Sequence, residues 1–151
     1  MNWDAVGALA EVIGAITVVI TLVYVAAEIR QNTKSNRNVA LQTISTQNAD
    51  WLSLITQDEG VARLFRVGQQ DPQELSDDER VRYGMLMTQF FRVFDTQFYQ
   101  YKTKVLPEEF WQSSVRSMQA ILRRKGARMW WTKYGAQMTL PFQQFLDDLI
   151  Q

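Results

Sequence analysis

The chain has 151 residues, and its 16 basic residues balance its 16 acidic residues to give a formal net charge of zero at pH 7. It contains no cysteine and no histidine, which excludes disulfide frameworks, thiolate zinc sites and every catalytic arrangement that pairs a nucleophile with an imidazole. With 21% charged and 46% hydrophobic residues, the composition disfavours both disorder and an extended nucleic-acid-binding surface.

The first predicted element is an apolar run over residues 6–27, which Glu11 alone interrupts with a charge. As a helix the run is about 33 Å long at about 1.5 Å per residue, enough to cross a bilayer core of about 30 Å. We therefore predict a transmembrane helix over residues 1–28.

Three alternatives to a spanning helix are a secretory signal, a buried core helix and an amphipathic helix in the membrane interface. Val25 and Ala27 would suit the cleavage site of a secretory signal, but no basic residue precedes the run. A core helix of this length would be unusual in so small a soluble domain, and an interfacial helix would need a charged face. Spanning the membrane is the favoured interpretation.

The flanking charges predict the orientation of this helix. Arg30, Lys34 and Arg37 follow the run, whereas only Asp4 precedes it. Since the positive flank stays in the cytoplasm, we expect a single-pass membrane protein with its N-terminus outside and its C-terminal domain in the cytoplasm.

At helical spacing, small and polar residues of the span gather on one face. Close backbone approach at such residues drives helix association in lipid. With one span per chain, the partner must be a second copy or another protein, and a homo-oligomer is favoured. We call this face the seam, and it consists of Gly7, Ala10, Glu11, Gly14, Thr17 and Thr21.

Glu11 needs a special explanation because a carboxylate inside a membrane is costly. It could hydrogen-bond a neighbouring helix of the seam, or it could reach the headgroups or be protonated as a spectator. It could also form a ring of carboxylates that lines an ion path. These three roles stay open.

Residues 29–57 contain neither proline nor glycine, so we expect the helix to continue into a stalk. A thin apolar stripe would support this stalk, made of Ala40, Ile44, Asn48, Trp51 and Ile55.

Residues 58–151 are predicted to form a small helical bundle. Leu64 and Phe65 point inward from a short first helix, and Ser76 with Glu79 forms a capping box that starts a long core helix. A further helix is expected from Pro107 to Gly126, and the last two over residues 129–134 and 142–150. The core helix has an aromatic and methionine stripe of Tyr83, Met87, Phe90, Phe91, Phe94, Phe98 and Tyr101. The fold class is therefore all-α.

Charge is unevenly distributed along the bundle. Residues 58–79 hold seven acids and two basic residues, whereas residues 110–146 hold six basic residues and no acid. The basic cluster could dock on anionic lipid, on an acidic protein partner or on the acidic segment itself. Alternatively, its cations decorate a helix end and its tryptophans fill the core. The candidate docking residues are Arg123, Arg124, Lys125, Arg128, Trp130 and Trp131.

Carboxylate pairs could serve glycoside hydrolysis or a hard-metal site without histidine. The candidates are Asp77-Asp78, Glu108-Glu109 and Asp147-Asp148. Adjacent residues on a helix point about 100° apart and do not converge. We expect no enzyme, no catalytic or metal-binding residue and no cofactor.

Three stretches carry a resemblance that covers nearly the whole chain. They are WDAVGALAEVIGAITVVITLVYVAAEIRQNT, RVGQQDPQELSDDERVRY and GARMWWTKYGAQMTLPFQQFL. Together they resemble a large family of bacterial single-pass membrane proteins of about this length, whose function is unassigned. The resemblance implies the fold and the membrane anchor, and it implies no reaction or site.

The sequence therefore favours a self-associating membrane protein that acts as a non-enzymatic scaffold or partner-docking platform and contacts lipid but no nucleic acid. A homo-oligomeric pore is the first alternative, in which Glu11 forms a ring and Thr17 and Thr21 hydrate the path. An accessory subunit of a larger membrane complex is the second.

Overall fold

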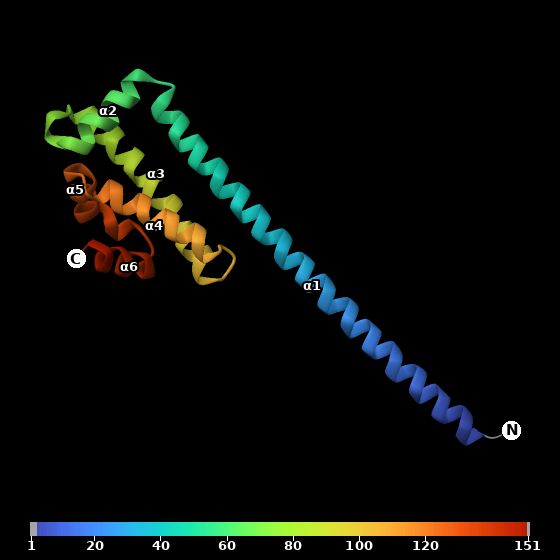
Figure 1. The fold of residues 1–151 in the computed structure, drawn as a ribbon. Helices are drawn as coiled ribbons and strands as arrows, with labels where there is room; N and C mark the ends of the chain where they lie inside the picture. Colours follow the sequence, from blue (N-terminus) through green and yellow to red (C-terminus); the bar gives the residue numbers. More distant parts are fainter. Residues whose placement is uncertain (1–2, 151) are drawn as a thin grey trace. The chain divides into compact units, whose positions relative to one another are not determined.

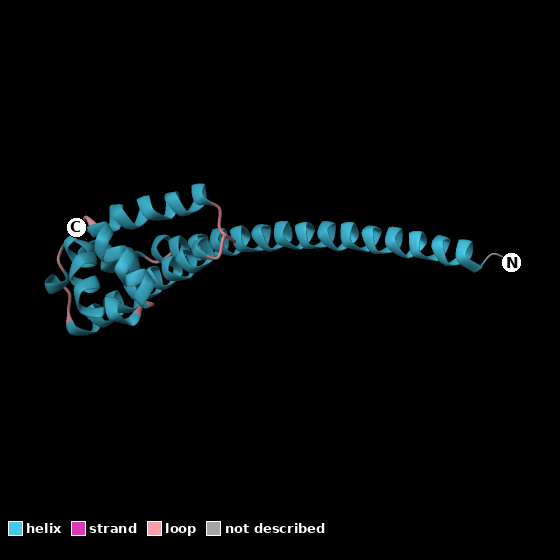
Figure 2. Ribbon diagram, turned by 90° about the horizontal axis from the view of Figure 1, so that it is seen from below, coloured by secondary structure: helices cyan, strands magenta, loops and turns pink. Residues whose placement is uncertain are grey.

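The computed structural model describes the backbone of residues 3–150 and the side chains of residues 7, 11 and 13–150. Within that range the chain forms six α-helices and two short 3-10 helices, and no strand occurs there (Figure 2). The predicted all-α fold is confirmed. Ala10 of the seam has its side chain outside the described residues.

The elements follow one another with short connections (Figure 1). A long helix of 54 residues comes first, and every later helix is less than half as long. In chain order they are α1 (Trp3–Thr56), α2 (Glu59–Gln70), η1 (Pro72–Glu74), α3 (Asp77–Lys102), α4 (Glu108–Leu122), α5 (Lys125–Tyr134), η2 (Gly135–Gln137) and α6 (Leu140–Ile150).

The chain divides into two compact units, Met1–Val39 and Ala40–Gln151. Helix α1 runs unbroken through the predicted span and stalk, as the lack of proline and glycine after residue 28 leads one to expect. The boundary between the units falls inside the predicted stalk of residues 29–57. The last turns of α1 therefore belong to the same unit as the bundle.

In the first unit, every described side chain of α1 is exposed. By length and composition, this helix is the one candidate membrane span among the described residues, and none of its most apolar window is buried. The core helix of a soluble protein would be mostly buried. The exposure therefore argues against the core-helix alternative, whereas a signal sequence would pass the same test.

In the second unit, the end of α1 packs on the bundle through Ala40, Ile44 and Trp51, which are buried. The Trp51 ring lies 5.6 Å from that of Phe90 between centroids. Asn48 is exposed, so the apolar stripe is narrower than predicted. These contacts supply the tertiary support that a segment rich in Asn, Thr and Gln needs to stay helical.

Helix α3 is the centre of the core, as predicted. Its capping box is present, with Ser76 and Glu79 bonded reciprocally through side chain and backbone. The Phe91 ring stacks on Trp130 with centroids 4.9 Å apart and planes 8° apart. The predicted stripe is buried except Tyr101, which is half-buried, and its buried members are Tyr83, Met87, Phe90, Phe91, Phe94 and Phe98.

The predicted helix end at Gly126 is wrong. Helix α4 ends at Leu122, and Gly126 lies in the first turn of α5. A Cβ atom on Gly126 would lie 1.8 Å from the carbonyl oxygen of Gly68 in α2. Glycine is required here because two helices approach each other closely, and not because a helix terminates.

The starts of the last two helices also differ from the prediction. Helix α5 begins at Lys125, ahead of the expected residue 129, and α6 begins at Leu140, so that Pro141 lies within its first turn. The carboxylate of Asp95 in α3 accepts hydrogen bonds from the Thr139 backbone N–H at 2.9 Å and from its hydroxyl at 2.5 Å. A residue far away in sequence thus sets where α6 begins.

Candidate functional site

The predicted seam occupies one face of α1. Gly7, Glu11, Gly14, Thr17 and Thr21 are all helical and exposed. At about 100° per residue they fall within an arc of about 120°. The geometry of α1 therefore brings together every described member of the seam on one face of the helix.

The two seam glycines are not needed for the fold of the chain itself. A Cβ atom built on Gly7 or on Gly14 would meet nothing within 4 Å. By contrast, one on Gly68 would lie 2.3 Å from the Tyr83 ring. The small size of Gly7 and Gly14 is thus available for the approach of another helix.

The two seam threonines satisfy their own hydroxyl donors. Thr17 Oγ1 donates to the carbonyl oxygen of Ile13 at 2.8 Å, and Thr21 Oγ1 donates to that of Thr17 at 2.8 Å. A threonine bonded in this way needs no water partner to remain in an apolar medium. This arrangement suits helix packing and weakens the reason for assigning these residues to a hydrated path.

Glu11 is exposed and makes no hydrogen bond or ion pair with another described residue. Residues 5–27 contain no second charge. No group among the described residues therefore balances its carboxylate, and the three roles predicted for it stay predictions.

The tryptophans of the basic cluster are core residues. Trp130 and Trp131 are 4% and 7% exposed. Trp130 Nε1 donates to the carbonyl oxygen of Gly84 at 3.0 Å, and Trp131 Nε1 donates to the Asp147 carboxylate at 2.8 Å. Of the two alternatives, the structure therefore supports core packing for this pair, which leaves neither ring free to dock on a lipid or a partner.

The acidic and basic segments meet within one chain. Lys125 forms a hydrogen-bonded ion pair with Asp71. This bond and a second hydrogen bond, from the Gln73 backbone N–H, lower the pKa of the Asp71 carboxyl. Within the acidic segment, Arg63 Nη1 lies 2.6 Å from a Glu79 oxygen. One predicted role of the basic cluster is to bind the acidic segment of residues 58–79, and Lys125 does so through Asp71.

The remaining cations of the cluster lie at the turn from α4 to α5. Arg123 and Arg124 are exposed, and neither side chain has a hydrogen bond or ion pair among residues 3–150. Arg128 Nε donates to the carbonyl oxygen of Leu122 at 2.7 Å. No acid among the described residues therefore neutralises the charge of Arg123, Arg124 or Arg128.

Arg123 and Arg128 line a small cavity of about 250 Å³ in the second unit. Sequence reasoning missed the other four residues that line it, because α4 and α6 bring them together from distant positions. They are Gln119, Leu122, Leu149 and Ile150.

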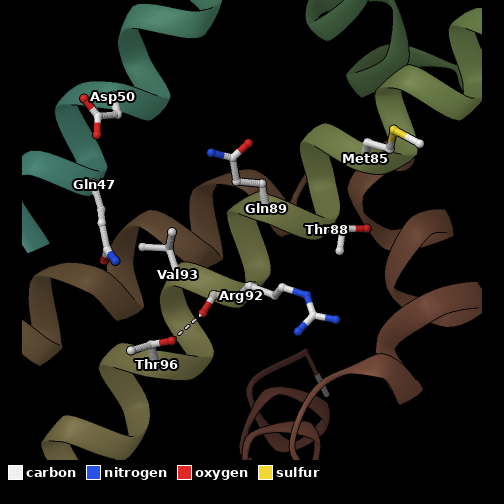
Figure 3. Close-up of a pocket in the computed structure, with 8 residues that line it drawn as sticks. All are labelled: Gln47, Asp50, Met85, Thr88, Gln89, Arg92, Val93 and Thr96. Carbon is white, nitrogen blue, oxygen red and sulfur yellow. Dashed lines mark hydrogen bonds between the residues drawn. The ribbon is translucent and has the colours of Figure 1, made fainter.

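A larger groove of about 500 Å³ runs between the end of α1 and α3, also in the second unit. Figure 3 shows Gln47 and Asp50 on one side and the α3 side chains on the other. The groove is open and mixes amides, one acid, one arginine and apolar side chains. Its α3 residues are Met85, Thr88, Gln89, Arg92, Val93 and Thr96.

The adjacent carboxylates do not form paired sites. Asp77 bonds Arg80, Glu108 accepts from the Gln112 amide at 2.7 Å, and Asp147 accepts from Trp131. Among the described residues, no group of three or more Asp or Glu side chains could hold a metal ion. In each pair, one carboxylate thus bonds a neighbouring side chain of the fold and not the adjacent acid.

No family model, no curated protein and no solved structure matches this chain. Its own side chains and their surroundings are therefore what supports a function.

Proposed function

We propose that this chain is a non-enzymatic, membrane-anchored protein that self-associates through the seam of α1 and acts as a scaffold or docking platform. The exposed apolar surface of α1 carries the proposal. Leu22, Val23 and Tyr24 are 63%, 65% and 66% exposed, and the most apolar window has no buried residue. Such a surface is costly in water and is stable in a bilayer.

The seam supports self-association in particular. Apolar burial drives helices together only weakly in lipid, so association relies on close packing at small residues. Gly7 and Gly14 are one heptad apart and have open space where a Cβ would lie. A second copy approaching there could bring its backbone close to that of the first.

The location proposed for the platform is the cytoplasmic face of the bacterial inner membrane. The basic residues that follow the span, Arg30, Lys34 and Arg37, support the cytoplasmic side. In this arrangement the helical unit Ala40–Gln151 presents its surface to cytoplasmic partners.

The mass of the full-length protein in lipid nanodiscs tests self-association. A discrete homo-oligomer is expected for the wild type, and Gly14→Leu is expected to reduce it because the added side chain separates the helices. Ile16→Phe is the matched control, since it adds bulk about 200° around the helix from Gly14. A monomeric wild type, or equal masses for wild type and Gly14→Leu, would refute the seam as a self-contact.

Labelling with a membrane-impermeant maleimide tests the anchor and its orientation. The chain has no cysteine, so single-cysteine variants report unambiguously. In intact spheroplasts, Asn2→Cys is expected to react, whereas Ser113→Cys is expected to react only after lysis. The opposite pattern would reverse the orientation, and a mature protein lacking residues 1–27 would identify a signal sequence instead of an anchor.

A further inference from the structure

The cavity between the end of α4 and the end of α6 has an unusual charge balance. Two arginines, Arg123 and Arg128, line it together with the Gln119 amide, and no Asp or Glu among the described residues does. Apolar side chains from α6, Leu149 and Ile150, complete the lining. The site is thus cationic on one side and apolar on the other.

Arg128 is held in place by the fold. Its Nε donates to the Leu122 carbonyl oxygen at 2.7 Å, and its two terminal nitrogens have no partner among the described residues. A guanidinium fixed through Nε presents its remaining N–H groups in a planar fork that matches two oxygens of an oxyanion. Arg123, one position after the end of α4, supplies a second guanidinium without a described partner.

The helix termini at the cavity carry partial charges of both signs, because α4 and α6 end there and α5 begins there. The carbonyl oxygens of Gln119 and Ile121 in the last turn of α4 accept the backbone N–H groups of Arg123 and Arg124 at 3.2 and 2.9 Å. Helix α5, which follows directly, has no acid in its first turn. The positive end of its dipole adds to the field of the arginines, whereas the negative ends of α4 and α6 oppose it. The attraction for an anion therefore rests on the two guanidinium groups.

We propose that this cavity binds a phosphate group, with Arg123 and Arg128 as its charged ligands and the Gln119 amide as a further donor. The apolar side of the cavity, Leu149 and Ile150, receives the carbon atoms of a phosphate ester. The headgroup of an anionic phospholipid and a soluble phosphate ester share this chemistry. The site is independent of self-association and goes beyond the proposed function.

Titration of the full-length protein with inorganic phosphate tests the site itself. The protein is held in phosphatidylcholine nanodiscs, and arginine side-chain NMR signals are followed. Phosphate is expected to shift the Arg123 and Arg128 signals. Arg123→Gln is expected to weaken binding about tenfold, as for the loss of a charge-assisted hydrogen bond. Because the Arg123 side chain bonds nothing in the fold, this variant should remain folded.

Arg116→Gln is the matched control. Arg116 is an exposed arginine of α4 that does not line the cavity, so its loss should leave phosphate affinity within about twofold. Arg128→Lys keeps the charge and removes the fork, and it should also weaken binding. Equal losses for Arg116→Gln and Arg123→Gln would overturn the proposal in favour of unspecific attraction.

Nanodiscs that contain phosphatidylglycerol, without added phosphate, identify the source of the phosphate. A shift of the same arginine signals there, lost in Arg123→Gln, assigns the site to lipid headgroups. A shift with inorganic phosphate alone assigns it to soluble phosphate esters. The absence of a shift in both experiments would overturn the proposal.

Discussion

The carbonyl oxygen of Gly68 lies where any residue larger than glycine at position 126 would place its Cβ atom. A Cβ on Gly126 would be 1.8 Å from that oxygen and 2.8 Å from the Tyr83 hydroxyl. Both glycines are buried, Gly68 in α2 and Gly126 in α5. Two helices therefore meet here backbone to backbone, and neither backbone can yield as a flexible side chain could.

Gly126→Ala is expected to destabilise the second unit by about 1–3 kcal/mol, the usual range for overpacking a core. Gly84→Ala is the control, because a Cβ there meets nothing within 4 Å. Replacing a glycine inside a helix at such a position stabilises it by about 0.5–1 kcal/mol. Denaturant unfolding of the full-length protein in detergent, followed by near-UV circular dichroism, measures both. Equal effects of the two variants would contradict the close approach.

Tyr83→Phe is expected to leave stability unchanged or to raise it by about 1 kcal/mol. The Tyr83 hydroxyl is buried and has no hydrogen-bond partner among the described residues, and burial raises the pKa of this phenol. Removing an unpaired buried polar group removes its desolvation cost. A loss of stability in the same unfolding experiment would reveal a partner for the hydroxyl.

The stability of the second unit should fall as the pH is lowered from 4.5 toward about 2, partly through Glu79. Hydrogen bonds from the Ser76 backbone N–H and from Arg63 lower the pKa of this carboxyl from 4.5 to about 2. A carboxyl with a lowered folded-state pKa stabilises the fold above its unfolded value and loses that contribution as it is protonated.

Glu79→Gln removes this titration, so the variant should be less stable near neutral pH and its stability should vary less between pH 4.5 and about 2. Asp148→Asn, at an exposed acid of α6 without an ion pair in residues 3–150, serves as the control. Urea unfolding at a series of pH values measures the difference. If the stability of Glu79→Gln depends on pH as strongly as that of the wild type, groups other than Glu79 are responsible for the pH dependence.

Asp147 and Asp148 are adjacent in sequence, yet the structure gives them different roles. Both side chains are exposed, but only Asp147 accepts a hydrogen bond from the buried Trp131 indole, and Asp148 has no hydrogen bond to another described residue. Asp147→Ala leaves a buried donor unpaired and should cost about 1–3 kcal/mol, whereas Asp148→Ala should be nearly neutral. Equal costs in denaturant unfolding would contradict the role of the indole hydrogen bond.

Local patterns predicted the helices well where the signals lie close together in sequence. The capping box at Ser76 and the three- and four-residue spacing of the α3 aromatics depend only on neighbours within the helix, and the structure confirms both. The unbroken course of α1 follows in the same way from the absence of proline and glycine after residue 28.

The errors arise where the reason for a residue lies far away in the chain. The local context of Gly126 is typical of a helix end, but a glycine is needed there because the backbone of Gly68 lies too close for a Cβ atom. The start of α6 depends on Asp95 in α3, and the cavity at Arg123 and Arg128 needs side chains from α6. No local periodicity contains these relationships.

Liposomes that contain the full-length protein are expected to show no cation flux above that of protein-free liposomes. The seam has a single carboxylate per chain, Glu11, and the hydroxyls of Thr17 and Thr21 donate to backbone carbonyls of their own helix, so few groups remain to solvate an ion path. Glu11→Gln should therefore leave flux at background, while gramicidin confirms that the vesicles are sealed. A wild-type flux that Glu11→Gln abolishes while the oligomer mass in nanodiscs stays unchanged would contradict the scaffold and favour a carboxylate-lined pore, because the loss could then not be explained by loss of assembly.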